Sequence, residues 1–119
     1  MYSLKNIVRW LYEAIYKKPY DTEGFIDLKQ IVIPEDYLAT TPHADKVKRM
    51  YTYYFRHQRL DEPITVRTDK NTHKTILVNG YIRSLISWDI ARTYMNTYNC
   101  KYEELPEKFC YVPIKWVKE

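Results

Sequence analysis

Apolar residues recur at intervals of three and four positions in three parts of the chain, which predicts three amphipathic helices. The first would lie within residues 3–18, the second within 43–58 and the third within 81–97. Thr41 followed by Pro42 suits the start of the second helix, because threonine caps helices and proline is tolerated at the first helical position.

Short runs rich in branched and aromatic residues lie between the helices and predict strands. These runs are residues 25–33, 60–66, 75–78 and 111–117. Residues 69–72 are turn-prone, so the second and third runs should form a hairpin. Pro113 has no N–H to donate, which favours an edge position or a bulge for the last strand. Residues 98–108 lack periodicity and are expected to form a surface loop or a short helical turn.

These elements together predict an α+β fold, a small mixed sheet with helices packed on it. A chain of 119 residues with 45% hydrophobic content fits one compact domain. We expect residues 25–119 to form that domain and residues 1–24 to add an N-terminal amphipathic helix.

Composition excludes several classes of protein. No apolar run approaches the roughly 20 residues that span a bilayer, and the N-terminus lacks the pattern of a secretory leader, so no membrane association and a cytoplasmic location are expected. Cys100 and Cys110 are too few for a disulfide scaffold and too far apart for a metal knuckle. We expect no metal and no cofactor.

Positive charge is concentrated in one part of the chain. Residues 43–74 hold eight basic side chains against four acidic ones, a surplus equal to the net charge of +4. Aromatic residues from Tyr51 to Phe55 are interleaved with this charge and suit either a nucleic-acid surface or the apolar side of a helix. The candidate nucleic-acid or partner surface comprises Lys46, Lys48, Arg49, Arg56, His57, Arg59, Arg67, Lys70 and Lys74.

The segment from Asn79 to Arg83 joins a predicted strand to a predicted helix through one of only two glycines. The first turn of that helix has free backbone N–H groups, and an arginine there can fork onto phosphate oxygens. We therefore predict a phosphate or nucleotide site at the glycine turn. The alternative is a structural turn, with Arg83 paired to Asp61, Glu62 or a helix carboxylate such as Asp89. The predicted site consists of Gly80, Tyr81, Ile82, Arg83 and Ser84.

The order of strand, helix, Leu60-Asp61-Glu62-Pro63-Ile64-Thr65-Val66, hairpin, Asn79-Gly80-Tyr81-Ile82-Arg83 and helix resembles the ParB/sulfiredoxin superfamily, over about residues 25–117. The free-standing members of phages and plasmids are the most similar. The resemblance implies a ParB/sulfiredoxin-like fold and a ligand that carries phosphate.

The turn departs from the family's reactive versions. Gly80 and Arg83 match the Gly-Glu-Arg-Arg turn of ParB proteins, which bind DNA and hydrolyse CTP, whereas Tyr81 and Ile82 do not. Tyr81 stands where sulfiredoxins have their reactive cysteine. Asn79 replaces the acid of the Asp-Gly-Tyr-x-Arg turn in free-standing relatives, and with it a possible metal ligand or base. These differences favour binding over catalysis, and no catalytic residue is assigned.

Three classes of function follow. The first is a non-catalytic, ParB-like nucleic-acid or nucleotide-binding protein from a mobile genetic element. The second is a phage- or plasmid-encoded inhibitor of the anti-CRISPR type, which binds an effector protein, a ribonucleoprotein or its guide RNA. Thirteen tyrosines favour this class, because tyrosine is enriched at recognition surfaces. The third is a ParB-like nuclease or nucleotide hydrolase. A homodimer is compatible with each class.

Overall fold

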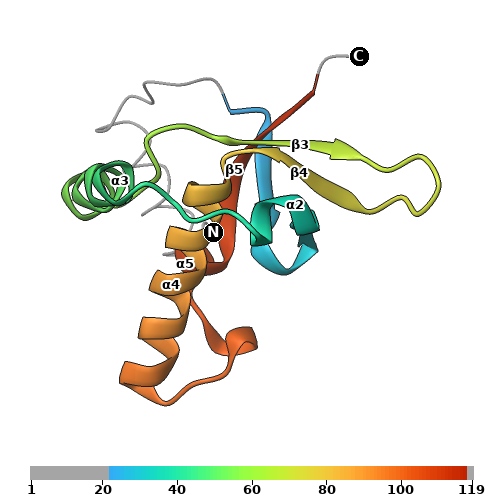
Figure 1. Ribbon diagram of the computed structural model, residues 1–119. Helices are drawn as coiled ribbons and strands as arrows, with labels where there is room; N and C mark the ends of the chain where they lie inside the picture. The colour runs from blue at the N-terminus through green and yellow to red at the C-terminus, as the bar shows by residue number, and fades with distance from the viewer. Residues whose placement is uncertain (1–21, 118–119) are drawn as a thin grey trace.

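Five strands form a single mixed sheet in the computed structural model, which describes residues 22–117 (Figure 1). The first helix predicted from the sequence lies outside the described residues. The strands are β1 (Gly24–Asp27), β2 (Ile31–Val32), β3 (Ile64–Thr68), β4 (Thr75–Asn79) and β5 (Tyr111–Trp116). The helices are α2 (Glu35–Leu38), α3 (Ala44–His57), α4 (Tyr81–Tyr98) and α5 (Glu107–Cys110), with 3-10 turns η1 (Leu28–Gln30) and η2 (Tyr102–Glu104). The α+β prediction is confirmed.

The strand order across the sheet is β1-β5-β3-β4-β2. β1 runs antiparallel to β5, β5 parallel to β3, β3 antiparallel to β4, and β4 parallel to β2. The hairpin predicted between β3 and β4 is confirmed. In its turn the Asp69 N–H donates to the Lys74 carbonyl at 2.8 Å and the Thr72 hydroxyl donates to the Asp69 carboxylate at 2.7 Å.

The strand predicted over residues 25–33 is wrong as one element, because η1 divides it into β1 and β2. The Asp27 carboxylate accepts a hydrogen bond from the Lys29 N–H at 2.9 Å. Such a local side-chain bond stabilises a turn in competition with a strand ladder. Leu28 within the turn is almost completely buried, so the interruption is also anchored in the core.

The sheet is strongly curled. β1 and β2 are its two edges, although only the three residues of η1 separate them in the chain. In a flat sheet the edges would lie about 19 Å apart, as four strand spacings require. The chain from Asp27 to Ile31 can span at most about 14 Å even when extended. The two edges must therefore curve toward one another.

Pro113 lies in β5, which is an internal strand, so the prediction of an edge strand is wrong. The Ile114 carbonyl accepts from Glu23 on the β1 side, whereas the Val117 N–H donates to Val66 on the β3 side. The backbone N–H and C=O groups of successive residues in a strand point toward opposite neighbouring strands. The backbone nitrogen of Pro113 therefore points toward β3, as that of Val117 does. Pairing with β3 begins one residue later, at Ile64 and Ile114. The position at which Pro113 lacks an N–H donor therefore lies just before the first pair of residues that joins β5 to β3.

Side chains from the sheet and the helices share one core. Its members are Leu28, Ile31, Tyr54, Leu60, Ile64, Val66, Leu77, Val112 and Ile114. Tyr54 is the contribution of α3 to this set. The helix begins at Ala44, two residues after Pro42, the predicted first helical residue. The Val47 N–H donates to the His43 carbonyl at 3.1 Å. No helix within residues 22–117 has the length and apolar character needed to cross a bilayer.

Tyr51 connects α3 to α4 by donating a hydrogen bond to the Asp89 carboxylate. Burial, this hydrogen bond and the negative charge of Asp89 raise the pKa of Tyr51 from 10.0 to about 12. Because the pKa is higher in the folded state, the contact stabilises the fold fully below pH 10 and loses its effect as the pH rises from 10 to about 12.

We expect Tyr51→Phe to cost about 1 kcal/mol near neutral pH, as for a net hydrogen bond at a partly exposed site. The difference between the wild type and the variant should vanish as the pH rises toward 12. Urea unfolding at a series of pH values from 8 upward measures this difference. A difference that stays constant with pH would contradict the assignment.

Candidate functional site

The glycine turn connects β4 to α4 and begins with a backbone conformation suited to glycine. Gly80 has φ 102° and ψ 34° and precedes the first helical residue, Tyr81. A Cβ atom at this position would lie 3.4 Å from Ile64 Cγ1. Tyr37 of α2 supports the turn, because its hydroxyl donates to the Val78 carbonyl and its ring lies 5.3 Å from that of Tyr81.

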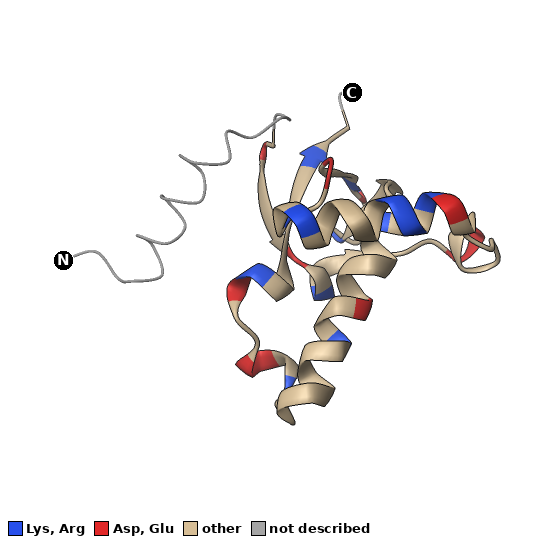
Figure 2. Ribbon diagram, turned by 90° about the vertical axis from the view of Figure 1, so that its left-hand side faces the viewer, with Lys and Arg blue, Asp and Glu red and all other residues tan. Residues whose placement is uncertain are grey.

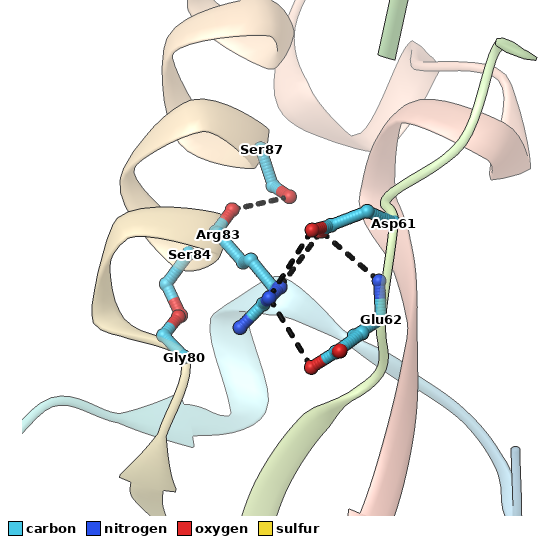
Figure 3. A network of polar contacts seen from close by, with 6 residues as sticks. All are labelled: Asp61, Glu62, Gly80, Arg83, Ser84 and Ser87. Atoms are coloured by element: carbon cyan, nitrogen blue, oxygen red, sulfur yellow. Dashed lines mark hydrogen bonds and ion pairs between the residues drawn. The ribbon is translucent and has the colours of Figure 1, made fainter. Parts of the chain in front are cut away.

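Arg83 is held by two carboxylates (Figure 3). Its Nε donates to Asp61 Oδ1 at 2.8 Å and its Nη2 donates to Asp61 Oδ2 at 3.2 Å. Nη2 also lies 3.3 Å from Glu62 Oε2. The Arg83 side chain is only 13% exposed and that of Asp61 is 29% exposed. Of the three acidic partners considered from the sequence, Asp61 and Glu62 engage Arg83, whereas Asp89 accepts from Tyr51.

Other residues at the start of α4 also make contacts within the fold. The buried hydroxyl of Ser84 donates to the Gly80 carbonyl at 3.2 Å, and the Ser87 hydroxyl donates to the Arg83 carbonyl at 2.9 Å. Ile82 lies beside α3, in a shallow pocket that also includes Val47 and Tyr51. One guanidinium faces two carboxylates here, so the local charge disfavours a phosphate. Phosphate binding at this turn stays a prediction.

The nine residues of the candidate surface do not form one patch. Lys70 and Lys74 lie in the turn of the β3–β4 hairpin, and Arg67 lies on β3. Figure 1 shows that the hairpin tip projects on the side opposite α3. His57 packs against Tyr53, with ring centroids 4.2 Å apart, and Arg59 is half-buried.

The cations of α3 are exposed to solvent. Lys46, Lys48, Arg49 and Arg56 are all exposed, and none forms an ion pair in the described part of the chain. Figure 2 shows α3 across the near side of the molecule, with basic positions toward both of its ends. Arg49 and Arg56 are seven residues apart and therefore share one face of the helix. We call Lys48, Arg49, Thr52, Phe55 and Arg56 the α3 solvent face.

Phe55, one of the aromatic residues interpreted from the sequence as suiting a nucleic-acid surface, lines a groove beside this face with aromatic residues of α4 and α5 that were not predicted to belong to a site. Phe55 of α3 is 64% exposed and Tyr98 of α4 is 66% exposed. They line a groove of about 270 Å³ together with Tyr94 of α4 and Phe109 of α5. The spacing of Ile90, Tyr94 and Tyr98 along α4 was a signal for this stripe, but the sequence alone did not show that it lies beside Phe55.

The histidines and the Glu103–Glu104 pair lie in separate parts of the described structure. No three His, Cys, Asp or Glu side chains between residues 22 and 117 lie together as metal ligands would. His43, His57 and His73 lie at the start of α3, at its end and in the hairpin turn. Glu103 forms an exposed ion pair with Lys29 at 2.8 Å, and Glu104 accepts from the Lys101 N–H at 3.0 Å.

A scan against protein-family models and searches of curated proteins and of solved structures find no match to this chain.

Proposed function

We propose that this protein is a nucleic-acid-binding domain whose phosphate contacts come from the α3 solvent face. One observation carries the proposal. Lys48, Arg49 and Arg56 are exposed on one helix without an acidic partner among the described residues, whereas Arg83 is held by Asp61 and Glu62. Unpaired cations on a rigid helix can replace the counterions of a phosphate backbone.

This proposal moves the binding surface away from the glycine turn. The resemblance to ParB-like domains implies a phosphate-bearing ligand, and the proposal keeps that class of ligand. It assigns Gly80 and Arg83 to the fold rather than to the ligand, because both are engaged with β3 and the segment that precedes it. The ParB-like family assignment and an origin in a mobile genetic element are part of the same proposal.

Removing one cation from the α3 solvent face tests the proposal. Lys48→Gln should weaken binding to a labelled oligonucleotide roughly fivefold near 0.1 M salt and lower the slope of log affinity against log salt by about 1. Lys70→Gln is the matched control, since it removes the same charge from the hairpin tip. Fluorescence anisotropy over a salt series measures both variants. Equal losses in the two variants, or affinity that does not depend on salt, would contradict the proposal.

A protein-binding role is the second candidate, and the exposed rings of Phe55 and Tyr98 favour it. Aromatic residues in a groove are frequent anchors of protein interfaces. An inhibitor of the anti-CRISPR type would use such a surface against an effector protein. Capture of a protein partner that survives nuclease treatment, without binding to bare nucleic acid, would select this candidate.

A further inference from the structure

We infer that the aromatic groove binds unpaired bases, so that the preferred ligand is single-stranded nucleic acid rather than a duplex. The inference rests on the proposed function and names the class of ligand. The groove is defined by the rings of Phe55, Tyr94, Tyr98 and Phe109.

The rings form a platform that the described fold leaves open to solvent. Tyr94 lies 4.5 Å from Tyr98 and 4.7 Å from Phe109, measured between ring centroids. Tyr98 lies at the exposed end of this cluster. Phe55 lines the groove from α3. The volume of the groove, about 270 Å³, lies just below the roughly 300–1,000 Å³ of small-molecule sites, which leaves room for flat rings but not for a folded element.

Basic side chains that could meet a phosphate backbone lie near two rims of the groove. Phe55 lies seven residues after Lys48 on the same face of α3, so a ring and a cation are about 10 Å apart along the helix. On the opposite rim, Lys108 Nζ lies 4.8 Å from the centroid of the Phe109 ring. Asp89 is the one acidic residue that lines the groove, and its carboxylate already accepts from Tyr51.

Exposed rings beside cations distinguish single strands from duplexes. In a duplex the base faces are stacked on each other, and a protein reaches only the base edges and the backbone. In a single strand each base can stack on an aromatic side chain, which contributes about 1–3 kcal/mol per base. The α3 cations alone would bind both forms, whereas the groove adds affinity only for unpaired bases.

The experiment compares the full chain with labelled dT12 and with a 12-base-pair duplex of mixed sequence. Phe55→Leu and Tyr98→Leu keep apolar bulk but remove the rings. Each should weaken binding to dT12 about tenfold and change duplex binding less than twofold. Trp116→Leu is the matched control, because Trp116 is an exposed aromatic residue outside the groove, at the end of β5. Thermal unfolding of each variant verifies that the fold is retained.

The possible results separate the inference from the proposed function. A selective loss of dT12 binding in the two groove variants supports the inference. Equal binding of both oligonucleotides, unaffected by Phe55→Leu but weakened by Lys48→Gln, overturns the inference and leaves the proposed function in place. Binding of neither oligonucleotide overturns both and leaves a protein partner as the occupant of the groove.

Discussion

Replacing Arg83 by methionine is expected to lower the free energy of unfolding by about 2–3 kcal/mol, because it leaves a partly buried carboxylate without its cation. Three N–H···O contacts hold Arg83 against Asp61 and Glu62, and its side chain is 13% exposed. These contacts join the first turn of α4 to the segment that leads into β3. Urea unfolding at neutral pH measures the loss.

Lys29→Met is the matched control for this prediction. It removes an ion pair of the same length, 2.8 Å to Glu103, in which both side chains are exposed. Such pairs contribute about 0–1 kcal/mol. Similar losses in the two variants would show that the Arg83 contacts add nothing beyond a surface pair.

The same variant decides between the two candidate phosphate surfaces. If α3 carries the phosphate contacts, folded Arg83→Met protein should bind oligonucleotides as tightly as the wild type. If folded Arg83→Met protein loses binding while Lys48→Gln keeps it, the glycine turn is the site and the proposal for α3 is wrong.

Ile64→Ala is expected to cost about 3–4 kcal/mol, within the range for buried isoleucine truncated to alanine. Ile64 is 0% exposed and lies in the central strand β3, opposite Ile114 of β5. Its side chain also packs under the glycine turn, where Cγ1 is 3.4 Å from the ideal Cβ position of Gly80. The substitution therefore leaves a cavity between the sheet and the start of α4.

Two further variants test whether this loss comes from the cavity. Ile64→Val removes one methylene and should cost about 1 kcal/mol. Val32→Ala truncates an exposed branched residue on β2 and should cost less than about 1 kcal/mol. Urea unfolding measures all three, and a loss for Ile64→Ala no larger than that for Val32→Ala would contradict the assignment of Ile64 to the core.

Local signals in the sequence were sufficient for much of the fold. The hairpin between β3 and β4 depends on Asp69 and its neighbours, which bond within the turn itself. The long helix α4 follows directly after Gly80, as predicted from the spacing of apolar residues, although its buried side chains include Ser84 and Ser87 as well as Ile86 and Ala91. Such features need no knowledge of distant contacts, so the sequence can predict them.

Features that depend on distant neighbours could not be predicted. The internal position of Pro113 follows from the register of β5 between two strands that are far away in the chain. The sequence left three acidic partners open for Arg83, and only the folded chain selects Asp61 and Glu62. The groove likewise requires α3, α4 and α5 to meet.

The curl of the sheet has a consequence for how the protein behaves at high concentration. Open strand edges can pair with another chain and start aggregation or domain swapping. Here the edge strands are short, with four residues in β1 and two in β2, and they curve toward one another. Edge-to-edge addition of a second copy is therefore disfavoured, and a homodimer would have to associate through its helices or side-chain surfaces.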